Sequence, residues 1–169
     1  MAPTAERMSQ RAGVSLRTVF HQFEDLATIH HLAGERLFDR VKQIPAPDAT
    51  DRSVKERVDA FVRYRVAVYD VLHPLSSAAR VREPFSPALR ANRDQMLQFG
   101  RDNVRLTFQP ELAVLKATQA ERVVAGIGLA TNWSAWYALL EELQQERSEA
   151  IIVMRAVTRA VLAGSQQFG

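Results

Sequence analysis

The chain has 169 residues, of which 47% are apolar and 24% are charged, and its formal net charge is +3. This balance leaves enough apolar material for a buried core and excludes a disordered or fibrous protein. The sequence contains no cysteine, which excludes disulfide scaffolds, thiol catalysis and cysteine-ligated zinc.

Helix start and stop signals divide the first quarter of the chain into three helices. Gly13 is placed to end the first, because glycine readily adopts the left-handed conformation found after helix ends. Ser15 can cap the second helix by accepting a hydrogen bond from the Thr18 amide. Asp25 can cap the third helix, which ends before Pro45. The predicted helices span residues 5–12, 16–23 and 26–43.

The rest of the chain predicts five further helices. Ser53 and Glu56 form a capping box, in which each side chain bonds to the other residue's backbone amide. Thr118 and Glu121 form a second box. Pro74 marks a helix end, because proline cannot donate the backbone hydrogen bond of a helix interior. The predicted helices span residues 54–72, 75–82, 87–108, 119–142 and 148–163.

Apolar residues recur at three- and four-residue spacing, and no segment alternates with the period of two that a half-buried strand requires. We therefore expect an all-α fold. The proline-containing stretch 44–52 predicts a hinge between two parts of the chain. It separates a head, residues 1–44, from a body, residues 45–169.

The sequence lacks the motifs of common enzyme classes. It has no nucleophile elbow, phosphate-binding loop, zinc-protease motif or glycine-rich dinucleotide loop. His30 and His31 point about 100° apart on a helix, so they are poorly placed to share a metal ion. We therefore expect no catalytic residue, no metal and no cofactor.

We also expect a soluble, cytoplasmic protein without a membrane partner. The apolar stretches look too short, and too often interrupted by arginine, glutamate and glutamine, to span a bilayer. No basic and then apolar segment at the N-terminus resembles a signal peptide.

The first two predicted helices and the turn between them, residues 5–23, have the design of a helix-turn-helix and are here called the corner. The residues predicted to point inward are Ala5, Met8, Ala12, Val14, Val19 and Phe23. Val19 and Phe23 lie about 40° apart, because a helix turns about 100° per residue. Arg17 and His21 lie equally close together on the opposite side. Arginine can hold guanine with two hydrogen bonds, and Thr18 suits a phosphate at a helix N-terminus. The alternative is an ordinary helical corner with a solvated Arg17 and His21.

The corner closely resembles the second and third helices of TetR-family transcriptional regulators. It matches, in order and spacing, the family's pattern of Ala-Gly-Val-Ser, then Thr-aliphatic-aromatic, then Phe. The matching residues are Ala12, Gly13, Val14 and Ser15, then Thr18, Val19 and Phe20, then Phe23. The resemblance implies a helix-turn-helix DNA-binding head, a linking helix, and a helical body that binds a ligand and dimerises. The family's head begins with one more helix, so this chain would start near the end of the connection after it.

The resemblance also implies a set of DNA contacts. Ser15 and Thr18 would touch backbone phosphates of double-stranded operator DNA. Arg17 and His21 would face base edges, and Gln22 would face the groove wall. The complete predicted DNA-binding set is Ser15, Arg17, Thr18, Phe20, His21 and Gln22.

Two positions depart from the family's pattern. Phe20 stands where the family usually has tyrosine, so a hydroxyl that contacts phosphate is missing. Leu26 stands where a lysine usually begins the fourth helix, so a second phosphate contact is lost.

Three helices of the body carry polar side chains within their apolar stripes. Aromatic stripes at helical spacing are often plain core, but a buried arginine, histidine or asparagine needs a partner. A ligand cavity with a few polar groups would supply one, and in the family these helices form that cavity. Arg65 and His73 would suit an acidic or hydrogen-bonding ligand. The predicted ligand-binding residues are Phe61, Arg65, Tyr69, His73, Met96, Phe99, Asn103, Asn132 and Trp136.

The last two predicted helices suit a dimer interface. Two such helices from each protomer would form a four-helix bundle with twofold symmetry, as in the family. The alternative is that these faces pack within one chain. The small residues concerned are Ala125, Gly126, Gly128 and Ala130, and the apolar ones are Ile151, Val157, Val161 and Leu162.

The sequence therefore predicts a ligand-responsive DNA-binding regulator, and specifically a repressor that a small molecule releases from its operator. One alternative is a dimeric small-molecule-binding module that has lost DNA binding, which the departures at Phe20 and Leu26 favour. Another is a small helical enzyme that uses His73 and Arg65 in the same cavity.

Overall fold

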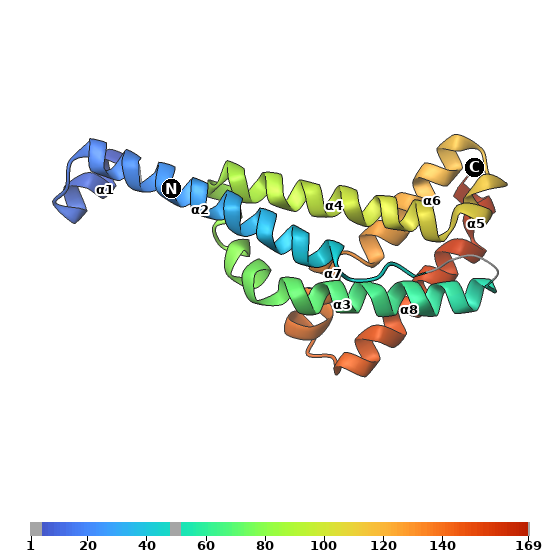
Figure 1. Ribbon diagram of the computed structural model, residues 1–169. Coiled ribbons are helices and arrows are strands. Elements are labelled where there is room, and N and C mark those ends of the chain that lie inside the picture. Colours follow the sequence, from blue (N-terminus) through green and yellow to red (C-terminus); the bar gives the residue numbers. More distant parts are fainter. Residues whose placement is uncertain (1–4, 48–51, 169) are drawn as a thin grey trace.

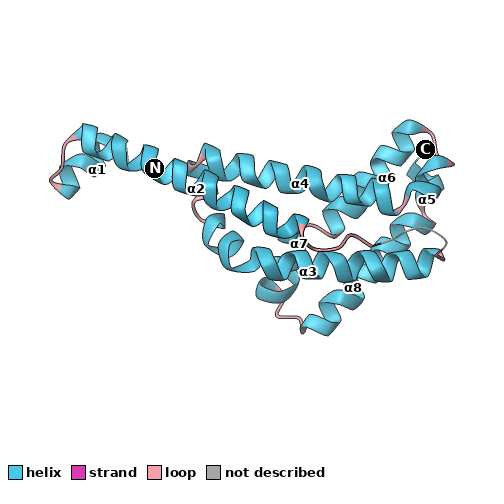
Figure 2. Cartoon of the chain, viewed as in Figure 1, coloured by secondary structure: helices cyan, strands magenta, loops and turns pink. Residues whose placement is uncertain are grey.

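The computed structural model describes residues 5–47 and 52–168. The chain is 84% helix, and no strand occurs in the described residues, which confirms the predicted all-α class (Figure 2). The helices are α1 (Ala5–Ala12), α2 (Leu16–Lys42), α3 (Val54–Arg80), α4 (Pro87–Thr107), α5 (Gln109–Ala113), α6 (Ala117–Ala130), α7 (Trp133–Tyr137) and α8 (Arg147–Ala163). Short turns complete the list: 3₁₀ turns η1 (Glu83–Phe85) and η3 (Ser165–Phe168), and a π-helical turn η2 (Ala138–Glu142).

Figure 1 shows an elongated bundle from which α1 and the beginning of α2 project at one end. The second half of α2 packs beside α4, while α3 packs against α8 and α6 packs against both α4 and α8. By contrast, α1 packs mainly on α2. The body is therefore a mutually supported bundle, and the corner extends from it.

The turn of the corner forms as predicted. Gly13 has φ +66°, in the left-handed region that ends a helix. The Thr18 amide donates to the Ser15 hydroxyl oxygen over 3.0 Å, which confirms Ser15 as a cap.

The prediction of separate helices over 16–23 and 26–43 was wrong. They form one helix of 27 residues, α2, with no turn before Asp25. The segment between them holds neither glycine nor proline, and a capping residue such as aspartate is also tolerated within a helix at small cost. The side chains of residues 22–27 lie outside the described residues, so the expected positions of Gln22, Phe23 and Leu26 are not tested.

The predicted helix end at Pro74 was also wrong, because α3 continues to Arg80. Proline removes one backbone hydrogen bond, and the turns on both sides retain the helix. The predicted helix 75–82 is thus mostly the end of α3. At its start, the Ser53 amide and hydroxyl donate to the Glu56 carboxylate, which confirms the capping box and lowers the pKa of Glu56.

The predicted helix 119–142 is divided into α6, α7 and η2. The Thr131 hydroxyl donates to the Ile127 carbonyl at the end of α6. The Asn132 side chain then accepts from the Ala135 amide over 2.8 Å and caps α7. Asparagine is a strong cap, and here it restarts the helix in a new segment.

The remaining boundaries differ from prediction by a few residues. α6 begins at Ala117, where the Gln119 side chain accepts from the Lys116 amide, so the predicted box at Thr118 does not form. α8 begins at Arg147 with Glu146 as its cap residue, so Ser148 is inside the helix. α4 ends at Thr107 and α5 follows almost at once. Residues 44–47 and 52–53 are non-helical, 48–51 lie outside the described residues, and the hinge at 44–52 stays a prediction.

The hydrophobic core lies in the body. Trp136, Tyr69 and Phe61 are among its largest fully buried side chains, with exposed fractions of 2% or less. Phe61 packs edge to face against Phe108, with ring centroids 5.3 Å apart. The core is continuous through the contacts of α3, α4, α6 and α8.

Part of the predicted dimer surface is used within the chain. Gly126 faces Val161, whose Cγ1 would lie 3.4 Å from a Cβ added at the glycine, so α6 and α8 approach closely. Leu162 is buried in the core, and Ile151 packs at its edge. The large apolar side chains that remain exposed on these two helices are Leu129, Ile152, Val153 and Val157.

One apolar stretch is longer than we predicted from the sequence. Ala117–Glu142 has the length and composition of a membrane span, with mean hydropathy 1.3, and no charge interrupts it from Val123 to Leu140. This corrects the statement that every such stretch is too short or too interrupted. In the structure, the turn at Thr131 and Asn132 divides the stretch into separate helices.

Candidate functional site

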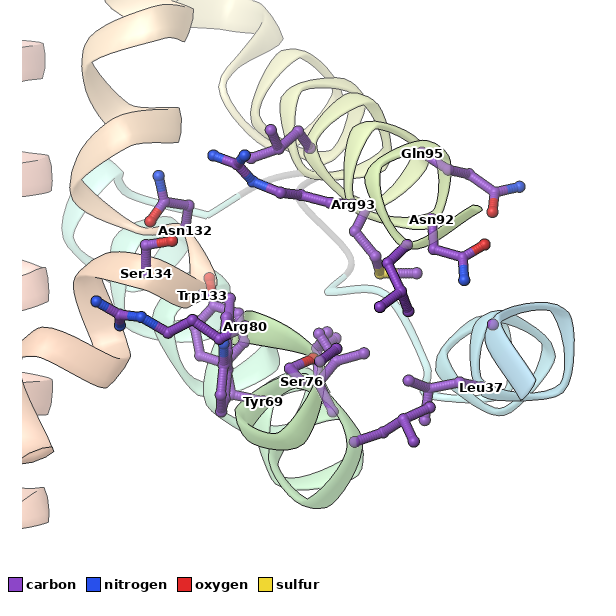
Figure 3. A pocket seen from close by; sticks show the side chains of 18 of the residues that line it. Leu37, Tyr69, Ser76, Arg80, Asn92, Arg93, Gln95, Asn132, Trp133 and Ser134 are labelled. Atoms are coloured by element: carbon purple, nitrogen blue, oxygen red, sulfur yellow. The ribbon is translucent and has the colours of Figure 1, made fainter. Parts of the chain in front are cut away.

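A cavity of about 320 Å³ lies between the second half of α2, α3, α4 and the start of α7. Figure 3 shows Leu37 facing it from α2, Tyr69 and Ser76 from α3, and Trp133 from α7. Its lining is a mainly apolar surface with a small number of polar groups, which is typical of small-molecule sites. Its apolar residues include Leu37, Val68, Leu72, Leu75, Leu89, Met96, Leu97 and Phe99.

Helical periodicity produces the two long walls. On α3 the lining residues begin at Arg65 and recur at three- and four-residue intervals as far as Arg80. On α4 they recur in the same way from Leu89 to Phe99. Fifteen residues of helix cover about 22 Å, so the cavity is elongated along α3.

Arg65 is the first residue of α3 that lines the cavity, and it is only 5% exposed. Its Nε donates to the Tyr69 hydroxyl oxygen over 3.0 Å and to the Thr131 carbonyl oxygen over 3.1 Å. Its Nη2 donates to the same carbonyl over 2.9 Å. The Tyr69 hydroxyl also donates to this carbonyl, and burial raises the pKa of Tyr69. These bonds join α3 to the end of α6.

Two half-exposed arginines of the cavity lining, Arg80 and Arg93, are here called the rim arginines, and each forms an ion pair. Arg80 Nη2 lies 2.8 Å from Glu142 Oε1, and Arg93 Nη1 lies 2.8 Å from Glu83 Oε1. Both arginines are about half exposed. Arg80 also lies 4.4 Å from the centroid of the Tyr137 ring, a cation–π contact. The charge of each rim arginine is therefore balanced by a carboxylate.

An aromatic cluster supports the wall formed by α7. The ring centroid of Trp133 lies 5.9 Å from that of Tyr69 and 5.5 Å from that of His73. Trp136 stacks on Tyr69 from behind, with centroids 6.0 Å apart. Only Trp133 and Tyr69 of this cluster line the cavity.

The structure brings five of the nine predicted ligand-binding residues to this cavity: Arg65, Tyr69, Met96, Phe99 and Asn132. The other four do not line it. Phe61 and Trp136 are core residues, Asn103 donates to the Phe99 carbonyl over 2.7 Å, and His73 is exposed beside Trp133. His73 and Arg65 thus do not share the cavity, which removes the geometry of the enzyme alternative.

Several lining residues were not predicted, among them Ser76, Arg80, Asn92, Arg93 and Trp133. Ser76 and Arg80 continue the Arg65 stripe, but the assumed helix end at Pro74 excluded them. Asn92 and Arg93 precede Met96 at three- and four-residue spacing on α4, a signal that the sequence did contain.

In the corner, the described side chains predicted to contact DNA are all exposed: Ser15, Arg17, Thr18, Phe20 and His21. Of the described side chains predicted to point inward, Val19 is buried, whereas Ala12 and Val14 are exposed, so the prediction was wrong for these two. They lie at the turn of the corner, which packs mainly on α2 and has little else to cover it. The hydroxyl oxygens of Ser15 and Thr18 lie 2.8 Å apart and form a hydrogen bond at the N-terminus of α2. Gln22 lies outside the described side chains.

One helix connects the corner with the cavity. α2 carries Arg17 and Thr18 in its first turn, and its residues Gly34 and Leu37 line the cavity. The Asn92 side chain, which also lines the cavity, donates to the His30 carbonyl oxygen of α2 over 2.9 Å. The cavity therefore includes residues from both sides of the predicted head–body boundary.

No group of acidic or histidine side chains in the described residues is arranged to hold a metal ion. A comparison of the chain with protein-family models, with curated proteins and with solved structures found no match.

Proposed function

We propose that the protein is a cytoplasmic, ligand-responsive transcriptional regulator, in which the corner binds operator DNA and the cavity binds a small-molecule effector. One observation carries the proposal: α2 holds the exposed Arg17 and Thr18 at its first turn and two cavity-lining residues in its second half. A ligand that moves this half of α2 also moves the first turn.

The corner supplies suitable chemistry for DNA. Ser15 and Thr18 present hydroxyls at a helix N-terminus, where backbone amides favour a phosphate. Arg17 is exposed next to them and can bind guanine through two hydrogen bonds. The resemblance to TetR-family regulators assigns these residues the same roles.

The regulator acts as a repressor in this proposal. The effector favours one of two positions of α2 against α4, and the corner binds the operator in the other position. Binding of the effector therefore lowers operator affinity, and operator DNA lowers effector affinity by the same factor.

A dimer of the chain, formed through α6 and α8, completes the proposal. Four large apolar side chains of these helices are exposed: Leu129, Ile152, Val153 and Val157. A second copy would cover them through a twofold axis, giving a four-helix interface. Two corners could then reach two half-sites on one face of DNA.

The direct test is a fluorescence anisotropy titration with DNA taken from upstream of the gene, at two salt concentrations. We expect saturable, sequence-selective binding, and we expect Arg17→Ala to weaken it by roughly tenfold or more. Arg36→Ala is the matched control, because Arg36 is also an exposed arginine of α2 but lies beyond the corner. Equal effects of the two variants, with a steep salt dependence, would indicate only general attraction to phosphate.

A second candidate is a dimeric small-molecule sensor without DNA binding. The exposed Phe20 favours it, because this side chain is 52% exposed and has no hydroxyl to offer a phosphate. The continuous α2 favours it as well, since the turn expected before Asp25 is absent. Binding of a ligand to the cavity, together with no selective DNA binding at either salt concentration, would support this candidate.

A further inference from the structure

The buried Arg65 is the starting point of an inference about the effector itself, which rests on the proposed role of the cavity. Its side chain is 5% exposed, yet no carboxylate among the described residues lies within 4 Å of its nitrogens. A buried cation without an anionic partner is unfavourable unless something neutralises it.

The hydrogen bonds of Arg65 leave part of the guanidinium available. All of them start from Nε and Nη2, and all end on the uncharged oxygens of Tyr69 and Thr131. Nη1 takes part in none of them. Gly100 makes room at this point, because a Cβ there would lie 3.0 Å from Nη1 and Nη2. The guanidinium therefore lies between α3 and Gly100 of α4 in the cavity lining, and no carboxylate pairs with it.

The rim arginines differ from Arg65 in this respect. Arg80 and Arg93 each pair with a glutamate, and both are about half exposed to solvent. An anionic group would have to displace a carboxylate to bind either one. The cavity lining thus carries an uncompensated positive charge at Arg65 and balanced charges at Arg80 and Arg93.

The walls between Arg65 and the rim arginines determine the rest of the ligand. Figure 3 shows Leu37 and Ser76 along one side of the cavity, with Arg93 on the opposite side. The side chains around this middle part are mainly aliphatic, including Leu72, Leu75 and Met96. An elongated, aliphatic space of about 320 Å³ suits a linear hydrocarbon chain.

We propose that the effector is a linear aliphatic carboxylate, whose carboxylate binds Nη1 of Arg65 and whose chain extends past Leu72 and Met96 towards Arg80. Arginine recognises carboxylates through charge-assisted hydrogen bonds, which are about twice as strong as neutral ones. The carboxylate supplies the missing counter-ion, and the chain removes apolar wall surface from water.

The first test compares octanoate with octanamide by isothermal titration calorimetry on the full chain. The two probes share one shape and differ in charge, so we expect octanoate to bind roughly tenfold or more tightly. Arg65→Lys should retain part of this preference, and Arg65→Met should abolish it. Arg63→Gln should leave it unchanged, because Arg63 is an exposed arginine of α3 that does not line the cavity. Equal binding of the two probes to the wild-type protein, or loss of the preference in Arg63→Gln alone, would overturn the proposal.

A second test needs no variant and so does not depend on how Arg65→Met folds. Octanoate labelled with ¹³C at its carboxyl carbon is titrated with acid while bound to the wild-type protein. A guanidinium beside the carboxylate lowers its pKa below that of free octanoate, whereas burial in an apolar cavity alone raises it. A lowered midpoint supports the contact with Arg65, and a raised midpoint refutes it.

These tests measure binding and do not involve DNA. If octanoate binds as described but the chain never binds an operator, the ligand assignment stands and the regulator proposal fails. If the operator binds selectively while octanoate binds no better than octanamide, the opposite conclusion follows.

Discussion

The corner and the body differ in how many of their side chains are buried. The corner has the more specific sequence pattern, yet of its described side chains only Ser9 and Val19 are buried, and Phe20 is exposed. The body has no recognisable motif, yet it holds a continuous core and a well-formed cavity. A specific sequence pattern therefore does not by itself indicate a region that is stabilised by its own core.

The largest expected difference between the two regions concerns core truncation. Trp136→Ala should lower the free energy of unfolding by about 3–5 kcal/mol, because it removes a large side chain that is 2% exposed. Phe20→Ala, in the corner, should change it by less than about 0.5 kcal/mol. Urea unfolding followed by circular dichroism measures both values. A similar loss in the two variants would show that the corner contributes to the core.

A second prediction concerns the apolar surface of α6 and α8. Val157→Glu places a charge in the proposed interface and should weaken the dimer by about 2 kcal/mol or more. Sedimentation equilibrium measures this shift towards monomer. Ala91→Glu serves as the control, since Ala91 is exposed on α4, away from that surface. A wild-type protein that is already monomeric would refute the dimer.

Two glycines of the body should change the free energy of unfolding in opposite directions when replaced by alanine. Gly100→Ala brings a Cβ within 3.0 Å of the Arg65 guanidinium and should destabilise the protein by about 1–3 kcal/mol. Gly128→Ala meets only Arg101 Cγ, at 3.9 Å, and should stabilise α6 by about 0.5–1 kcal/mol. Thermal unfolding gives the sign of each change. Stabilisation by Gly100→Ala would mean that Arg65 is free to move away.

The last prediction compares two serines, Ser53 and Ser148, that the sequence predicts at the start of a helix. Ser53→Ala removes the cap of α3 and should cost about 1 kcal/mol. Ser148→Ala should have almost no effect, because Ser148 lies inside α8 and Glu146 occupies the cap position. The two variants should therefore unfold at clearly different urea concentrations. Equal midpoints would place the start of α8 at Ser148 after all.

The fold could be predicted from the sequence where local signals act alone. The all-α class, the turn at Gly13 and the caps at Ser15 and Ser53 all follow from backbone preferences within a few residues. Helix continuity could not be predicted in the same way. Asp25 and Pro74 predicted helix boundaries, but α2 continues through Asp25 and α3 continues through Pro74. Each of these long helices packs on a neighbour, α2 on α4 and α3 on α8.

The cavity was predicted in part for a related reason. Stripes at three- and four-residue spacing correctly indicated Arg65, Tyr69 and Met96, because those spacings define one face of a helix. They could not distinguish the lining from the core behind it, which is where Phe61 lies. That distinction depends on how far apart α3 and α4 stand, and this distance is not encoded in one helix.

The length of α2 has a mechanical consequence. An α-helix is stiff over this length, and about 30 Å separates Leu37 at the cavity from Arg17 at the corner. A rotation of about 5° at the cavity end displaces the other end by roughly 3 Å. This displacement is comparable to the length of a hydrogen bond, so a rotation too small to disturb the core would suffice to break the contact that we propose between Arg17 and a base.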